Sequence, residues 1–235
     1  MRNSIQEMKA DIVRTVGQLC AAAAVTAPKS GGQLFLKGKP LFIETALIDD
    51  QITLKRLADW MRARGKERRQ EIWFRDAAMA ERIDGVLFIG LKGWYPPIYD
   101  CGACGYATCA EFMEATRDLR TASREFEFAG PHCNLRDIDL GIAVGSAVKA
   151  ASLNNVDTRC QTRIAVAARK LGLIEAEVAV GLSMSVTHKN VGFDNRMPAI
   201  EFDSAELANL PGTGTIPVKL PNKRWSHAPQ VEAEE

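Results

Sequence analysis

Apolar residues recur every three or four positions over several stretches of the chain, and this spacing is typical of one face of an α-helix. The first stretch predicts a helix from Ser4 to Val25, which must end at the proline and paired glycines that follow. The later stretches predict five more helices: Ile52 to Arg69, Glu71 to Arg82, Glu111 to Arg120, Asp137 to Leu153, and a last helix that Asp157 caps and that ends at Leu171.

The predicted helix from Asp137 to Leu153 is rich in small residues. We expect them to form its inner face: Gly141, Ala143, Gly145, Ala147, Ala150 and Ala151. Small side chains let two backbones approach closely, so this face packs against another helix or, alternatively, against a flat cofactor. Helix packing is the favoured interpretation.

Three short apolar segments predict β-strands, over Leu41 to Ile48, Gly85 to Leu91 and Ala176 to Leu182. The second segment is apolar throughout, which is typical of a strand buried on both faces. Because helix dominates over strand, the expected class is α+β (mixed α/β), in one helix-rich domain over residues 1–195. Residues 196–235 are punctuated by Pro and Gly and predict an extended or loosely ordered tail.

The composition excludes several classes of protein. The chain has 235 residues, is 46% hydrophobic and 25% charged, and carries a formal net charge of +1, which argues against global disorder and against a dedicated nucleic-acid binder. No apolar run approaches the roughly 20 residues of a membrane span. Charged residues from Glu7 to Arg14 interrupt any export signal, so the expected location is the cytoplasm. Basic residues gather over 62–69, as a solvated helix end or as a contact surface for an anionic partner.

Six cysteines change this picture, because cytoplasmic cysteines that cluster indicate a metal or catalysis rather than disulfides. Four of them fall in one region, with the spacing C-x2-C-x4-C and a fourth cysteine 24 positions later: Cys101, Cys104, Cys109 and Cys133. The other two, Cys20 and Cys160, stand alone, and we expect each to be a small buried residue.

Four thiolates can bind either a 4Fe–4S cluster or a structural zinc ion. Gly102 and Gly105 accept positive φ and so allow the loop to wrap around one centre. A single C-x2-C pair with two separate cysteines favours iron and sulfur over a zinc ribbon. Trp94 and Tyr95 either shield such a cluster or pack in the ordinary way, and His132 is expected near the site rather than as a ligand.

The cysteine core Cys-Gly-Ala-Cys-Gly-Tyr-x-x-Cys resembles the signature of 4Fe–4S domains in electron-transport proteins. Together with Leu87–Gly93, Asp139–Lys149, Asn155–Arg159 and Lys189–Asp194, it is similar to a prokaryotic family of uncharacterised proteins that contain a ferredoxin domain. This resemblance implies a bound cluster, held by an insert over about 94–135, and names no reaction.

A fainter resemblance, through the first helix and the Ala-Pro-Lys-Ser-Gly-Gly segment after it, is to the nitroreductase fold. That resemblance implies a homodimer and the possibility of FMN, for which Lys29, Ser30 and Lys149 are the candidate contacts.

Three functions stay open at this point. The first is an iron–sulfur protein that exchanges single electrons with a partner oxidoreductase, through the basic region or the tail. The second is an iron–sulfur flavoenzyme that reduces a small substrate, and the third is a non-catalytic assembly subunit with a structural metal. The sequence contains no serine-nucleophile elbow, zinc-protease motif, Walker loop or G-x-G-x-x-G loop.

Overall fold

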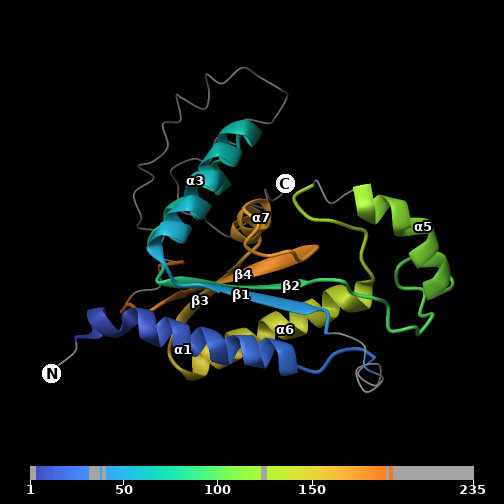
Figure 1. The fold of residues 1–235 in the computed structure, drawn as a ribbon, viewed down its shortest axis with the longest axis horizontal. Coiled ribbons are helices and arrows are strands. Elements are labelled where there is room, and N and C mark those ends of the chain that lie inside the picture. The colour runs from blue at the N-terminus through green and yellow to red at the C-terminus, as the bar shows by residue number, and fades with distance from the viewer. Residues whose placement is uncertain (1–3, 32–37, 39–40, 123–125, 189–190, 193–235) are drawn as a thin grey trace, which may run out of the picture.

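A computed structural model of the protein describes residues 4–31, 38, 41–122, 126–188 and 191–192 (Figure 1). The described residues form six helices: α1 (Ile5–Thr26), α3 (Gln51–Arg68), α4 (Glu71–Ala80), α5 (Cys109–Ala122), α6 (Asn134–Leu153) and α7 (Arg163–Lys170). They also form four strands: β1 (Ile43–Ile48), β2 (Gly85–Leu91), β3 (Asp157–Gln161) and β4 (Val178–Ser185). The α+β class is therefore confirmed, whereas the predicted tail over 196–235 lies outside the described residues.

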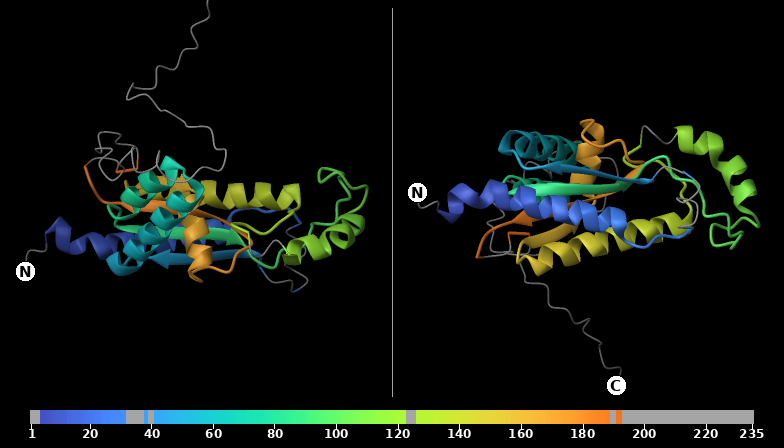
Figure 2. Two further views of the ribbon diagram at one scale, coloured as in Figure 1. Left: turned by 90° about the horizontal axis from the view of Figure 1, so that it is seen from above. Right: turned by 60° about the horizontal axis from the view of Figure 1, so that its bottom comes forward.

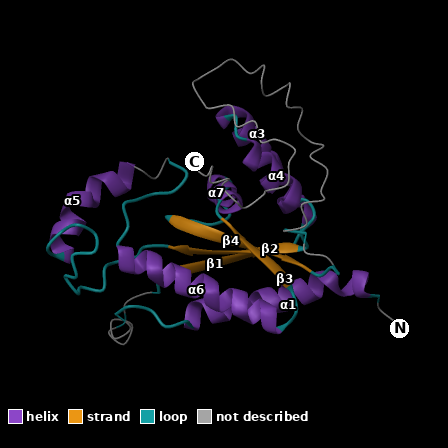
Figure 3. Ribbon diagram, turned by 180° about the vertical axis from the view of Figure 1, so that it is seen from behind, coloured by secondary structure: helices purple, strands orange, loops and turns teal. Residues whose placement is uncertain are grey.

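The four strands form one antiparallel sheet in the order β1-β2-β4-β3, and helices cover both of its faces. Helices α1 and α6 lie side by side on one face, and α3, α4 and α7 lie on the other (Figures 1 and 3). Helix α5 stands apart from these layers, at one end of the sheet (Figure 2).

The central strand β2 is buried along its whole length, as its apolar sequence predicts. Successive side chains of a strand point to opposite faces of the sheet. Leu87 and Ile89 therefore pack with α1 and α6, while Val86 and Phe88 pack with α3, α4 and α7. The two hydrophobic cores share this strand, so every layer of the molecule is fixed through it.

Helix α1 begins and ends close to where its sequence predicts. Ser4 and Glu7 form a capping box, in which each side chain accepts a hydrogen bond from the other residue's backbone N–H. The face that includes Val13 and Cys20 is buried, which confirms the prediction for that cysteine. The helix ends at Thr26, two residues before Pro28.

The segment after α6 differs from the prediction. Asp157 does not cap a helix but opens β3, which pairs with β4 from Asp157↔Ser185 to Gln161↔Gly181, and the last helix begins only at Arg163. A short segment takes strand geometry when a neighbouring strand offers it hydrogen-bonding groups, and β4 does so here. Because β3 is an edge strand, Cys160 is exposed, and the prediction that it is buried is wrong.

The small residues of α6 are divided between two faces. Ala143, Ala147 and Ala151 are buried in the core beneath the sheet, as predicted. Gly141 and Gly145 are exposed on the opposite face, so the prediction that they belong to the inner face is wrong.

Among the described helices, none combines the length and the apolar character that a membrane crossing requires.

Candidate metal centre

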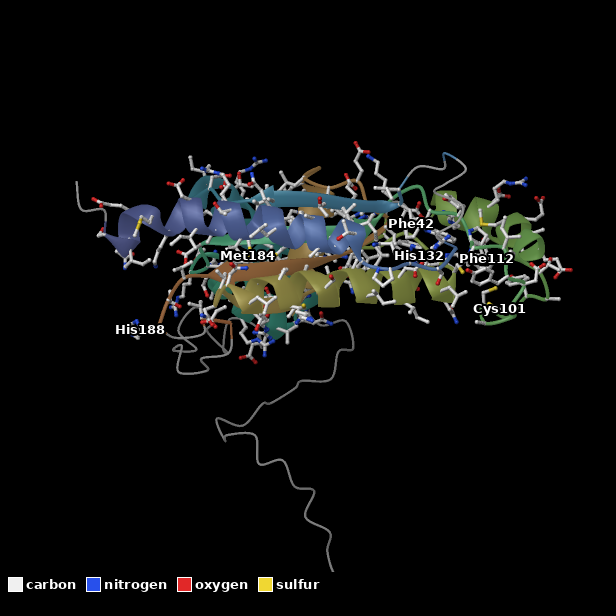
Figure 4. All side chains as sticks on the ribbon, turned by 90° about the horizontal axis from the view of Figure 1, so that it is seen from below. Phe42, Cys101, Phe112, His132, Met184 and His188 are labelled. Atoms are coloured by element: carbon white, nitrogen blue, oxygen red, sulfur yellow. The ribbon has the colours of Figure 1, made fainter. Side chains whose placement is uncertain are left out.

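The four clustered cysteines reach one site from three separate parts of the chain. Cys101 and Cys104 lie in the loop before α5, Cys109 is the first residue of α5, and Cys133 directly precedes α6. All four line one hollow, at the end of the molecule where Figure 4 labels Cys101 and Phe112. None is in a disulfide, and among the described residues no three side chains of metal-binding type lie close enough to hold a single ion.

Two of these cysteines occupy helix N-termini. Thr108 and Glu111 form the capping interactions that begin α5 at Cys109. Cys133 is the N-cap residue of α6, and its carbonyl accepts a hydrogen bond from the Arg136 N–H at 2.8 Å, while the N–H groups of Leu135 and Arg136 lie beside its thiol. Burial raises the pKa of the Cys133 thiol, and these N–H groups lower it in part. Helix N-termini favour negative charge, so both positions suit thiolate ligands.

The loop before α5 is tightly coiled. Gly102 and Gly105 have φ of 71° and 87°, as the sequence predicts, and the N–H of Gly105 donates to the Gly102 carbonyl at 2.9 Å. Ile98 and Asp100 also have positive φ, which is uncommon without glycine and is a genuine outlier for the β-branched Ile98. Asp100 is held there because its carboxylate accepts a hydrogen bond from the backbone N–H of Cys109 at 2.7 Å.

Trp94 is buried beside the cysteine loop, with only 3% of its surface exposed. Its ring stacks on Phe112, with centroids 6.3 Å apart, and contacts His132 edge to face at 5.7 Å. Its indole N–H donates to Glu177 at 3.0 Å, and the guanidinium of Arg120 lies over the ring and pairs with the same carboxylate. Trp94 does not line the hollow, so it does not cover the thiols. It instead packs α5 against His132 and against Glu177, the residue that precedes β4.

His132 contacts Trp94 and lies outside the hollow. Burial lowers the pKa of its imidazole, against the opposing effect of Asp137 and Glu177. The neutral ring is therefore the favoured form at neutral pH. The expectation that this histidine lies near the site agrees with its position.

Arg136 forms a buried anchor between the cysteine region and the end of α1, and sequence reasoning missed it. Its guanidinium donates to the carbonyls of Tyr95 and Ser30 at 2.6 and 2.8 Å and pairs with Asp139 at 2.6 Å. The Ser30 N–H donates to the other oxygen of Asp139, and Phe42 lies under the guanidinium at 4.1 Å. The only signal in the sequence is the i,i+3 spacing of an arginine and an aspartate on one helix.

The predicted FMN contacts do not all come together. Ser30 meets Asp139 as described, and Lys29 lies beside it, with Nζ donating to the carbonyls of Ala24, Val25 and Ala27 at the end of α1. Burial lowers the pKa of Lys29, and Asp139 acts in the opposite direction. Lys149 is exposed on α6, ten residues beyond Asp139 and therefore about 15 Å along the helix. FMN binding stays a prediction.

The basic residues over 62–69 are largely paired with carboxylates. Arg62 binds Glu81 through two hydrogen bonds of 2.8 and 2.7 Å. Arg64 and Arg68 both pair with Glu127, at 3.0 and 2.9 Å. This part of the surface is therefore less positive than its sequence indicates.

Comparison with known proteins identifies the family. A family model described as "Uncharacterized protein containing a ferredoxin domain" matches residues 129–195, and a model described as "Putative Fe-S cluster" matches residues 97–117. An uncharacterised protein of Archaeoglobus fulgidus is 35% identical over 189 residues, which cover 80% of this chain and 95% of the relative. The chain belongs to the family of uncharacterised proteins containing a ferredoxin domain. Its two matched regions include all four clustered cysteines, so the prediction of an iron–sulfur protein is confirmed.

A more remote similarity concerns the fold of this ferredoxin-domain protein. Nitroreductase A from Vibrio parahaemolyticus aligns with it at a TM-score of 0.42 and 11% identity, over 77% of this chain. The chain spans 59% of that nitroreductase. The faint resemblance noted in the sequence is thus matched by a weak structural neighbour, which carries no functional argument.

Proposed function

We propose that this protein binds one 4Fe–4S cluster and transfers single electrons to or from a partner oxidoreductase. The observation that carries the proposal is that four free cysteines, at three places along the chain, line one hollow. The four ligands in this proposal are Cys101, Cys104, Cys109 and Cys133. A cluster ligated by four thiolates supplies a one-electron couple, whose potential depends on hydrogen bonds to sulfur and on exposure to solvent.

The residues around the ligands have separate tasks in this proposal. Gly102 and Gly105 supply the positive φ with which the loop turns around the proposed cluster. The N-terminus of α6 stabilises the thiolate of Cys133 through its N–H groups. Tyr106 and Phe112, whose ring centroids are 5.7 Å apart, line the hollow and reduce the access of water to it.

We further propose that the protein works as a homodimer in the cytoplasm. The outer face of α6 supports this proposal, because Ile138 and Ile142 are exposed there beside Gly141 and Gly145. A helix that is apolar on both faces is usually buried on both. The free state of all six cysteines agrees with a reducing compartment.

The ligand set is tested by replacing each of the four cysteines with serine and measuring iron and acid-labile sulfide after anaerobic purification. We expect each single variant to lose most of its 4Fe–4S absorbance, because three thiolates leave one iron without a protein ligand. Cys160→Ser is the matched control, since this exposed thiol lies on β3 and not in the hollow. A Cys133→Ser variant with the iron and sulfide of the unaltered protein would remove that residue from the ligand set.

A further inference from the structure

We propose that the exposed surface around Cys101 is the docking face for an electron-carrier protein with a basic rim. This inference rests on the proposed function, because it assigns the partner chemistry to the same site. The docking face is defined by an apolar centre, Ile98, Tyr99 and Tyr106, and by an acidic rim, Asp100, Glu111, Glu114 and Asp118.

The charge of this region is unlike that of the whole chain. From Trp94 to Thr116 the sequence contains three acidic residues and no Lys or Arg, although the chain as a whole has a net charge of +1. The first basic residue, Arg117, is paired with Glu114. A bound 4Fe–4S cluster with four thiolates adds further negative charge at the centre of this face. The surface therefore attracts a positively charged partner.

The acidic residues of α5 are arranged on the side that the core leaves open. Over residues 109–120 of this helix, Phe112 and Thr116 are buried, whereas Glu111, Glu114 and Asp118 are exposed. Asp118 is nine residues from Cys109, so the rim extends about 14 Å along the helix from the ligand. Because α5 stands at one end of the molecule, no other described helix covers this side (Figure 2).

The centre of the face is apolar and lies directly over the ligands. Ile98, Tyr99 and Tyr106 are 66%, 50% and 36% exposed, and Tyr99 and Tyr106 line the same hollow as the cysteines. Cys101 is the exposed ligand, while Cys133 is buried against the core. Protein interfaces commonly have an apolar centre within a polar rim, and electron-transfer complexes are among the smallest of them. The shortest way for an electron to leave the thiols is therefore through this face.

The structure disfavours the alternative docking surface over 62–69. Its arginines already pair with carboxylates, as at Arg62 with Glu81 and Arg68 with Glu127. On the rim around Cys101, Glu114 pairs with Arg117. The paired arginines of 62–69 therefore offer an anionic partner less charge than their sequence indicates, whereas a basic partner meets the acidic rim at the cysteine end.

The test measures the rate at which the reduced, iron-loaded full chain reduces a basic cytochrome c, at several salt concentrations. One electron passes from the reduced protein to the ferric haem, which becomes ferrous, and no proton or bond is transferred. The second probe is the same cytochrome after succinylation of its lysines, which reverses the charge of its surface. We expect the basic probe to react about tenfold faster at low salt, and its rate to fall as salt rises.

The variant Glu114→Lys/Asp118→Lys reverses two charges of the rim without touching a cysteine. We expect it to slow the basic probe about tenfold at low salt and to speed up the succinylated probe. Its control is Asp11→Lys/Asp59→Lys, which makes the same change in net charge at exposed positions, each with an i,i+3 arginine partner like that of Glu114. Iron content and the optical spectrum are measured on every sample.

The outcomes separate this inference from the proposed function. A rate that does not depend on salt, an equal effect of the two double variants, or a faster reaction with the succinylated probe would overturn the docking face while leaving the cluster intact. Loss of iron and sulfide from the unaltered protein would instead overturn the proposed function. The docking face stands if only the rim variant changes the order of the two probes.

Discussion

Replacement of Arg136 by methionine is the sharpest test of how the cysteine region is attached to the core. Arg136 is fully buried, and its guanidinium makes the three hydrogen bonds described above, of which one is an ion pair with the fully buried Asp139. In Arg136→Met the aspartate remains without its counter-charge. Breaking a buried ion pair by removing one partner costs about 3–5 kcal/mol.

This cost translates into a measurable change in thermal stability. For a chain of this size each 1 kcal/mol lowers the Tm by about 2–4 °C, so we expect a decrease of roughly 10 °C. We also expect a lower iron content, because Arg136 holds the carbonyl of Tyr95 shortly before the first cysteine. The assay is thermal and denaturant unfolding followed by circular dichroism, on anaerobically purified protein.

The control is the double variant Arg136→Met/Asp139→Leu, which removes both charges. It loses the same two carbonyl hydrogen bonds as the single variant, and it also removes the acceptor of the Ser30 N–H. If the buried charge dominates the cost, the double variant should be more stable than Arg136→Met by about 1–2 kcal/mol. A single variant that loses less than about 1 kcal/mol, or a double variant that is less stable than the single one, would refute this reasoning.

Three further predictions follow from local features. Gly105 has a φ of 87°, so Gly105→Ala should lower the iron content and should lower the free energy of unfolding by about 1 kcal/mol. Gly141 lies within α6, so Gly141→Ala should instead raise the free energy of unfolding by up to about 1 kcal/mol. Equal effects of the two variants in denaturant unfolding would contradict this. Arg62 lowers the pKa of Glu81, so the stabilisation is present above the unfolded pKa and is lost as the pH falls through the folded pKa. Glu81→Gln should therefore destabilise by up to about 1 kcal/mol at pH 7 and progressively less as the pH falls below the ordinary carboxyl pKa, and a difference that does not shrink in acid would count against the pair. Trp94→Phe removes the indole hydrogen bond and should cost about 1 kcal/mol, measured as a lower denaturant midpoint; an unchanged midpoint would show that the bond adds nothing.

Local pattern predicted those elements whose surroundings are encoded in their own residues. The apolar run from Gly85 to Leu91 predicted a strand buried on both faces, because no side of it carries polar residues for solvent. The spacing of the cysteines predicted a metal site, because metal ligation by a short loop requires such spacing. Both features need few residues and no knowledge of the rest of the chain.

The features that were missed depend on residues far away in the sequence. Asp157 opens a strand only because β4, whose register partner there is Ser185, lies beside it. The buried pair of Arg136 depends on Ser30, which is 106 positions earlier. Cys160 was expected to be buried, and its exposure follows from the position of β3 at the edge of the sheet. Tertiary pairing decides each of these outcomes, and a single stretch of sequence does not contain it.

The central claim is that the four clustered thiols hold a 4Fe–4S cluster, and elemental analysis tests it most directly. Iron, acid-labile sulfide and zinc are measured on one anaerobically purified sample of the full chain, together with its optical spectrum before and after reduction. We predict about four iron and four sulfide per chain, with a brown colour that bleaches on reduction. About one zinc per chain in a colourless protein would contradict it.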